Sequence, residues 1–272
     1  MPDRYAVIGH PVAHSKSPWI HAWFARATGQ DMEYVRLEAP LDGFERTVDE
    51  FRAAGGRGAN VTLPFKQAAS RYCSELSVCA RAARAVNTLS FDGTHAYGDN
   101  TDGAGLLRDL TVNLARRVAG EDILLLGAGG AARGVVGPLL EARPARLVIA
   151  NRTPPRAVAL VADFASAARG VQLAALGYEA LGSASFDVVI NATSAGMSGA
   201  ALPVPASVFG RDALAYEMVY GRDTPFLALA RAAGAAAHDG LGMLVEQAAE
   251  SFLLWRGLRP DTAAALAALR AA

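Results

Sequence analysis

Residues 123–133 read ILLLGAGGAAR, an apolar run that enters a glycine-rich turn and continues into a helical pattern. This order predicts a strand, a tight turn and a helix, an arrangement that binds the pyrophosphate of a dinucleotide. Gly127 permits the tight turn, Gly129 lets the backbone approach the phosphates, and Ala132 lets the helix pack closely on the strand. The alternative, a glycine-rich turn without a ligand, leaves the flanking strand and helix unexplained.

The end of the next predicted strand, residues 148–153 (VIANRT), indicates which dinucleotide is bound. NAD-binding chains usually place an acidic residue here to hold the ribose hydroxyls, and this chain has none. Arg152 and Arg156 instead offer guanidinium groups suited to a phosphate, and Asn151 and Thr153 add hydrogen-bond donors. The pattern predicts NADP. In the alternative interpretation the two arginines only cover the first turn of a surface helix.

Composition narrows the class of partner. The chain has 272 residues, 52% of them hydrophobic, with 26 basic and 26 acidic side chains. This balance provides no basic field for nucleic acid or an anionic membrane, so we expect a small-molecule substrate. No leader or membrane-spanning pattern is evident, which predicts a cytoplasmic protein. Cys73 and Cys79, in a stretch that we interpret as helical, are expected to be free thiols, and no metal is expected.

Strand-like and helix-like runs alternate along most of the chain, which predicts an α/β fold. Strands are expected near residues 5–9, 34–37, 58–62, 85–91, 123–126, 147–150, 171–173, 188–191 and 213–219, with helices at 17–27 and 41–54 and only helices from about 241. Two α/β units predict two lobes with a cleft between them. We assign residues 1–101 and 241–272 to a substrate domain and 102–240 to a Rossmann-type dinucleotide-binding domain.

The segment GHPVAHSKSP, residues 9–18, places hydroxyl groups just ahead of a predicted helix. Ser15 and Ser17 can face one ligand together, and with the helix-start amides they can hold a carboxylate. The alternative is simple capping, with Ser17 as the N-cap and Pro18 at the first helical position.

Lysine is rare in this chain, because only Lys16 and Lys66 among the 26 basic residues are lysine. A lysine ammonium can exchange a proton, whereas arginine stays protonated. Lys66 also begins a predicted helix, where its charge opposes the helix dipole unless function or a partner holds it there. Asp102 adds a carboxylate further along the chain, although it could merely cap the helix that follows.

Nine motifs, spread over nearly the whole chain, resemble those of the shikimate dehydrogenase family. They are GHPVAHSKSP, GANVTLPFK, AVNTL, GDNTDGAGL, LLGAGGAARG, ANRT, NATSAGM, EMVYGRDTPFL and DGLGMLVEQAA. The resemblance implies reversible NADPH-dependent reduction of 3-dehydroshikimate to shikimate, in aromatic amino-acid biosynthesis. It implies Lys66 and Asp102 as the catalytic pair, and it implies contacts with shikimate from Ser15, Ser17, Thr62, Asn87, Tyr220 and Gln247.

The resemblance also implies which residues bind NADP. These are Gly127, Ala128, Gly129, Gly130 and Ala131 in the turn, Asn151, Arg152, Thr153 and Arg156 after the next strand, and Thr193, Met218 and Gly240. Two departures from the family pattern are His10, where asparagine is often found, and the adjacent prolines at 154 and 155.

Two other functions stay open at this point. A quinate/shikimate dehydrogenase of dual specificity would share almost every motif, and a non-catalytic NADP-binding sensor would share the nucleotide site. The sensor would be expected to lack a complete lysine–aspartate pair, which this chain retains. A homodimer is one assembly that the sequence allows.

Overall fold

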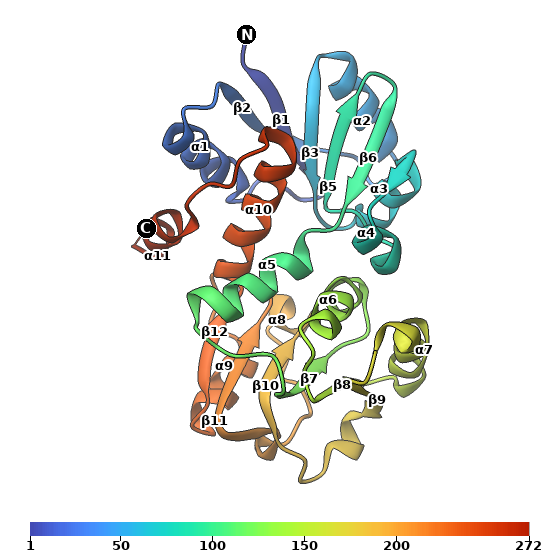
Figure 1. The fold of residues 1–272 in the computed structure, drawn as a ribbon, viewed down its shortest axis with the longest axis vertical. Helices are drawn as coiled ribbons and strands as arrows, with labels where there is room; N and C mark the ends of the chain where they lie inside the picture. The colour runs from blue at the N-terminus through green and yellow to red at the C-terminus, as the bar shows by residue number, and fades with distance from the viewer. Residues whose placement is uncertain (272) are drawn as a thin grey trace. The chain divides into compact units, whose positions relative to one another are not determined.

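The computed structural model describes residues 1–271, which divide into two compact units (Figure 1). The first unit combines residues 1–105 with those from Leu244 onward, and the second runs continuously from Leu106 to Met243. The boundaries therefore fall a few residues after those expected at 101/102 and 240/241. Asp102 belongs to the first unit because its carboxylate bonds to Lys66 and Asn87, both in that unit.

A six-stranded mixed sheet forms the centre of the first unit. Its strands are β1 (Asp3–Gly9), β2 (Met32–Glu38), β3 (Gly56–Val61), β4 (Glu75–Leu76), β5 (Thr88–Asp92) and β6 (His95–Asp99), in the spatial order β2-β1-β3-β5-β6-β4. The helices are α1 (Ser17–Thr28), α2 (Phe44–Ala53), α3 (Lys66–Tyr72), α4 (Val78–Ala83), most of α10 (Leu241–Arg256), and α11 (Thr262–Ala271). β1 and β3 are parallel, and β5 is antiparallel to both β3 and β6.

The two faces of this sheet have different coverings. Ala6 and Ile8 pack with Phe44 and Phe51 of α2, because alternate side chains of a strand share a face. Tyr5, on the opposite face, stacks on Trp255 of α10 with ring centroids 4.6 Å apart. Helix α10 therefore covers the face that α2 does not (Figure 1).

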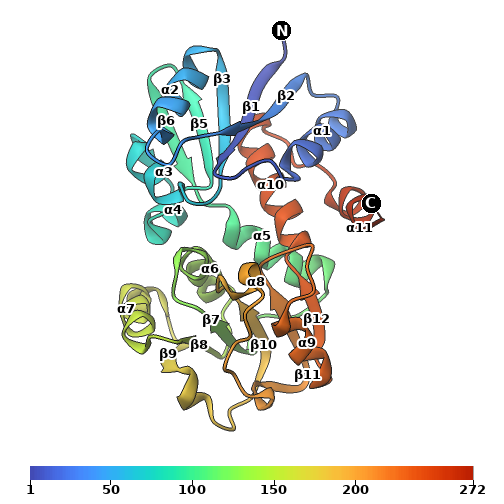
Figure 2. The same ribbon diagram turned by 180° about the vertical axis from the view of Figure 1, so that it is seen from behind.

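The second unit has a parallel sheet in a doubly wound order. Its strands are β7 (Asp122–Leu126), β8 (Arg146–Asn151), β9 (Gln172–Gly177), β10 (Phe186–Asn191), β11 (Phe209–Glu217) and β12 (Ala236–Asp239), in the order β12-β11-β10-β7-β8-β9. Helices α6 (Gly130–Glu141) and α7 (Pro154–Phe164) cover one face, and α9 (Pro225–Ala232) covers the other (Figure 2). The strand order reverses between β7 and β10, which is where such sheets bind dinucleotides.

The α/β fold class is confirmed, and every expected strand overlaps a strand of the structure. One local expectation and one alternative interpretation were wrong. The stretch that holds Cys73 and Cys79 is not one helix, since β4 separates α3 from α4. The N-cap of α1 is Lys16 and not Ser17, whose backbone N–H is bound by the Ser15 hydroxyl oxygen. Neither Cys73 nor Cys79 forms a disulfide in the described part of the chain, and burial raises the pKa of Cys73 to about 12.

Among residues 1–271, no helix is long and apolar enough to cross a membrane. In the same part of the chain, no group of three or more His, Cys, Asp and Glu side chains could hold a metal ion.

Candidate active site

Two helix starts bring Lys66 and Asp102 together in the first unit. Lys66 is the first residue of α3, and Asp102 is the first residue of α5 (Asp102–Arg108). Lys66 Nζ lies 2.6 Å from Asp102 Oδ2, and the two side chains are 28% and 11% exposed. The dipole of α3 opposes the lysine charge, and the aspartate beside it offsets that cost. Asp102 is therefore the partner that holds Lys66 at a helix start, where its charge would otherwise be unfavourable.

Asn87 fixes the other oxygen of that aspartate. Its Nδ2 donates to Asp102 Oδ1 at 2.9 Å, and its Oδ1 accepts from the backbone N–H of Thr101 at 2.9 Å. Because a backbone N–H can only donate, it determines which end of the Asn87 amide faces Asp102. Both Asp102 oxygens then accept hydrogen bonds, as the oxygens of an ionised carboxylate do.

Gln247 joins this cluster from helix α10. Its Oε1 lies 3.2 Å from Asn87 Nδ2, and its Nε2 donates to the backbone oxygen of Leu244 at 3.0 Å. The Thr101 hydroxyl donates to the backbone oxygen of Gln247 at 3.1 Å. Four of the expected site residues, Lys66, Asn87, Asp102 and Gln247, are thus linked by hydrogen bonds.

A second layer of polar residues supports the cluster, and sequence reasoning missed it. Asn60 Nδ2 donates to Ser251 Oγ at 2.9 Å and to Thr88 Oγ1 at 3.2 Å. The Thr88 hydroxyl in turn donates to Asn87 Oδ1 at 2.9 Å. All four side chains are buried. The available signal was polar side chains on strands and a helix whose neighbours are apolar.

Ser15, Ser17 and Thr62 lie at one edge of the same sheet. The register pairs Ile8 with Val61, so β1 and β3 end side by side and the loops that follow them share an edge. Ser15 and Ser17 follow β1, whereas Thr62 follows β3, as Lys66 does. Arg36 of β2 donates to the backbone oxygen of Ser15 at 2.6 and 3.1 Å. Tyr220 lies in the second unit, after β11, and is half-buried.

The glycine turn of the second unit has the features required for a phosphate group. Gly127 has φ +109°, in the left-handed region, and a Cβ there would lie 3.1 Å from the Ala192 carbonyl oxygen. Gly129 is the N-cap of α6, and a Cβ on Gly129 or Gly130 would meet no atom within 4 Å. Ala128 is half-buried and Ala131 is exposed. The first amides of α6 therefore border open space, and a helix start leaves such amides without intrahelical partners.

The end of β8 presents the two arginines to solvent. Arg152, Thr153 and Arg156 are exposed, and no ion pair involves either arginine within residues 1–271. Asn151 is half-buried, and its Nδ2 donates to the backbone oxygen of Thr153 at 2.9 Å. One amide proton of Asn151 is therefore used within the loop, whereas both guanidinium groups are available for a phosphate.

Thr193, Met218 and Gly240 follow the carboxyl ends of β10, β11 and β12. Thr193 packs against the glycine turn, since a Cβ on Gly127 would lie 3.2 Å from its Cγ2 atom. A Cβ on Gly240 would lie 2.4 Å from the Met218 carbonyl oxygen, so only glycine fits. All the expected nucleotide residues lie at the carboxyl edge of the sheet, as the doubly wound fold requires.

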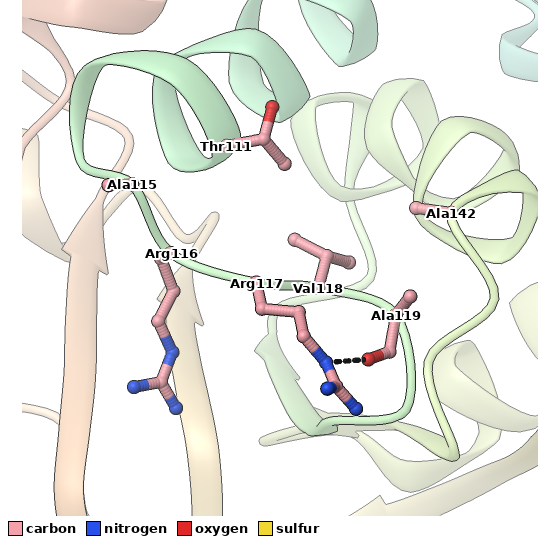
Figure 3. A pocket seen from close by; sticks show the side chains of 7 residues that line it. All are labelled: Thr111, Ala115, Arg116, Arg117, Val118, Ala119 and Ala142. Atoms are coloured by element: carbon pink, nitrogen blue, oxygen red, sulfur yellow. Dashed lines mark hydrogen bonds between the residues drawn. The ribbon is translucent and has the colours of Figure 1, made fainter.

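A surface hollow elsewhere in this unit lies apart from the expected nucleotide residues (Figure 3). It is lined by Thr111, Ala115, Arg116, Arg117, Val118, Ala119 and Ala142, from the segment that leads into β7 and the end of α6. Arg116 is bound to Glu121, and Arg117 donates to the Ala119 carbonyl oxygen at 2.7 Å. The hollow contains none of the expected site residues.

A doubly wound sheet with a glycine turn, together with a paired ammonium and carboxylate, defines a dinucleotide-linked oxidoreductase. Family models match residues 7–89 (shikimate dehydrogenase substrate binding domain), 109–198 (shikimate / quinate 5-dehydrogenase) and 240–270 (shikimate 5'-dehydrogenase C-terminal domain). The shikimate dehydrogenase (NADP(+)) of Methylobacillus flagellatus is 57% identical over 99% of this chain and all of its own. The chain belongs to the shikimate dehydrogenase family, which confirms the resemblance of its motifs.

Solved structures agree with this assignment. An Ael1 enzyme from Pseudomonas putida is 49% identical, with a TM-score of 0.92 over 98% of both chains. Shikimate 5-dehydrogenase from Thermus thermophilus, in complex with NADP(H) and shikimate, is 36% identical, with a TM-score of 0.87 over 99% of both chains.

Proposed function

We propose that this chain catalyses the reversible NADP-linked interconversion of 3-dehydroshikimate and shikimate. The observation that carries the proposal is the hydrogen-bonded cluster of Lys66, Asp102, Asn87 and Gln247, which adjoins the edge where Ser15, Ser17 and Thr62 lie. Membership of the family supports the same reaction, because its full-length relatives are NADP(+)-dependent shikimate dehydrogenases.

The second unit fits NADP. The glycine turn leaves open space at the start of α6, and two exposed arginines without acidic partners follow β8. Gly127 to Ala131 would hold the pyrophosphate, Asn151 to Arg156 the phosphorylated ribose, and Thr193, Met218 and Gly240 the remainder of the nucleotide. When bound, the reduced nucleotide supplies the hydride for the carbonyl carbon of the substrate.

Lys66 and Asp102 manage the proton that accompanies this hydride. In the reducing direction, Lys66 Nζ donates a proton to the carbonyl oxygen, and in the oxidising direction it takes the proton back. Asp102 orients the ammonium through the 2.6 Å contact and accepts a hydrogen bond from a substrate hydroxyl. Because the two groups are in direct contact at 2.6 Å, we assign the transferred proton to the pair and not to either residue alone.

The other polar side chains would orient the substrate. Ser15 and Ser17, with Tyr220, would hold the carboxylate, and Thr62, Asn87 and Gln247 would hold the ring hydroxyls. Binding energy from these contacts would fix the carbonyl in a reactive orientation.

A dual shikimate and quinate specificity is the second candidate. It is favoured by the family model matched at residues 109–198, which describes shikimate / quinate 5-dehydrogenases. A non-catalytic sensor has no such support, because the lysine–aspartate pair is complete.

We also propose a cytoplasmic location and a homodimer. Cell fractionation would test the location, and light scattering of the purified chain would test the assembly.

One assay separates these functions. The purified chain is given shikimate or quinate, with NADP or NAD, and absorbance of the reduced nicotinamide is followed. We expect the largest kcat/KM with shikimate and NADP. Comparable rates with quinate would support dual specificity, and no turnover of either acid by chain that binds NADPH would support the sensor.

A further inference from the structure

Glu217, the last residue of β11, is a buried carboxylate that the proposed mechanism does not use. Its side chain is 0% exposed, and no lysine, arginine or histidine forms an ion pair with it within the described residues 1–271. Burial raises the pKa of Glu217, and the hydrogen bonds of Asn191, Val219 and Thr224 oppose this shift. A buried charge without a cation costs stability, so its retention calls for a specific role.

Three donors from different segments converge on this carboxylate. Asn191 Nδ2 donates to Oε2 at 2.8 Å, and Thr224 Oγ1 donates to the same oxygen at 3.0 Å. The backbone N–H of Val219 donates to Oε1 at 3.3 Å. Glu217 therefore ties together the end of β10, the turn after β11 and the start of α9.

The hydrogen bond to Glu217 holds the Asn191 side chain in place. The backbone N–H of Thr193 can only donate, so the Asn191 oxygen faces Thr193 and the NH2 end faces Glu217. That oxygen accepts from Thr193 N at 3.0 Å and from Thr193 Oγ1 at 2.8 Å. The proton of the Thr193 hydroxyl is thereby fixed, and its oxygen accepts from Ala195 N at 3.2 Å.

The same chain of contacts ends at the nucleotide residues. Thr193 packs on Gly127 of the glycine turn, and Met218 N donates to the Asn191 carbonyl oxygen at 3.0 Å. Gly196 lies over the carboxylate, where a Cβ would come within 2.9 Å of both oxygens. A glycine is therefore needed at this position for Glu217 to occupy its place.

We propose that Glu217 is a positioning residue for NADP, acting through Asn191 on Thr193 and through the β11 turn on Met218. The proposal rests on the nucleotide site of the proposed function. An isosteric amide at position 217 has one acceptor oxygen where the carboxylate has two, so in either orientation its NH2 group faces a donor: Val219 N–H, or Asn191 and Thr224. The turn would rearrange, and the nucleotide would bind less tightly while the chemistry of the first unit stayed intact.

The test compares Glu217→Gln with Asp109→Asn, a matched control. Asp109 is also a buried carboxylate of the second unit, and it accepts from Tyr216 Oη at 2.5 Å and from Asn113 Nδ2 at 2.9 Å. Neither donor belongs to the expected nucleotide residues. NADPH affinity is measured by fluorescence titration, kcat and both KM values by the shikimate assay, and stability by thermal unfolding.

We expect Glu217→Gln to weaken NADPH binding at least tenfold, with kcat at saturating NADP and the shikimate KM within about threefold of wild type. We expect Asp109→Asn to lower the unfolding temperature and to leave NADPH affinity within about twofold. Equal nucleotide affinity in the two variants would overturn the proposal. Adding Thr193→Val to Glu217→Gln should weaken NADPH binding by less than about a further twofold, because the chain of hydrogen bonds is already broken. If the two substitutions instead have fully additive effects on NADPH affinity, Glu217 does not act through Thr193.

A milder pair keeps the proposal testable if Glu217→Gln does not fold. Thr224→Val removes one donor to Glu217, whereas Thr224→Ser retains it. We expect NADPH affinity to fall about two- to fivefold in the first variant and to stay unchanged in the second, and equal affinities would overturn the proposal. If the wild-type chain fails to bind NADPH, the proposed function itself is overturned. If the wild-type chain binds NADPH and the variants bind it equally well, only the role of Glu217 is overturned.

Discussion

The two units use six-stranded sheets in different ways. In the first, an ammonium, a carboxylate and amides come together from α3, α5, the residue before β5, and α10, and a buried layer of polar side chains supports them. In the second, the expected nucleotide residues are backbone turns at the carboxyl edge of a parallel sheet and two exposed guanidinium groups. The difference suggests that substitutions in the first unit should alter turnover, and those in the second should alter nucleotide affinity.

The strongest test of this division is Lys66→Ala. We expect kcat to fall by roughly 10²–10⁴, the usual contribution of a general acid, while NADPH affinity stays near normal. Steady-state kinetics and NADPH titration measure the two quantities. Lys66→Arg should restore little activity, because arginine keeps the charge and does not release its proton. Near-normal turnover in Lys66→Arg would mean that Lys66 acts only as a charge, and a loss of nucleotide affinity would break the division between the units.

Substrate choice should depend mainly on the first unit, to which all the expected shikimate contacts except Tyr220 belong. Quinate carries an extra hydroxyl on the carbon that bears its carboxylate, and an unpaired buried hydroxyl costs roughly 1–3 kcal/mol. We expect shikimate to be preferred by about ten- to several-hundredfold in kcat/KM. The ratio should be the same with NADP and NAD. A ratio that changes with the cofactor would show that the bound nucleotide affects substrate selection, and a ratio near one would indicate dual specificity.

Arg152→Ala should weaken the binding of NADP by the second unit and leave the substrate chemistry of the first unit unchanged. A charge-assisted contact with the 2'-phosphate is worth roughly 1.5–3 kcal/mol, so the KM for NADP should rise about tenfold or more. The KM for NAD should barely change, because NAD lacks that phosphate. Arg211→Ala is the control, since Arg211 is an exposed arginine near the amino end of β11, whereas the expected nucleotide residues lie at the carboxyl ends of the strands. Equal losses with NADP and NAD would mean that Arg152 supports the fold.

The units should also differ in their response to acid. His21, in α1, is fully buried and stacks on Tyr34 at 4.2 Å, and burial lowers the pKa of His21 to about 3. Below pH 6.5 the unfolded chain binds a proton at this histidine that the folded chain does not, so stability falls as pH falls from 6.5 toward 3. This histidine should cost about 1 kcal/mol between pH 6.5 and 5.5.

Urea unfolding at pH 7.5, 6.5 and 5.5 measures this effect. His21→Phe should reduce the loss of stability at low pH, because phenylalanine suits the aromatic surroundings and does not titrate. Since other groups titrate equally in both proteins, the difference between the two curves isolates His21. Parallel curves for wild type and variant would contradict the prediction.

Local patterns in the sequence predicted much of the fold. The strand, turn and helix at residues 123–133 are contiguous, so their apolar run and glycines were sufficient. The hairpin of β5 and β6 was missed, because its second strand is short and has few apolar residues. The alternative that Ser17 is the cap was wrong, and Pro18 could not distinguish it, because proline suits the first helical turn from either register.

The site could be predicted only where a residue stands out locally or belongs to a family motif. Lys66 stood out by its rarity and its place at a helix start. Asn60 bonds to Ser251 across 191 positions of the chain, and such a pairing leaves no local pattern. Glu217 was also missed, because its partners come from the ends of separate segments.

The two units also differ in how the chain forms them. The second is one continuous segment, whereas the first combines residues 1–105 with residues that follow Met243. Domains generally fold as units while the ribosome extends the chain. The nucleotide-binding unit is therefore fully synthesised before Gln247 and Ser251 have been added. A message truncated after codon 243 would yield a product with the glycine turn and both exposed arginines after β8, but without the helix that carries Gln247 and Ser251.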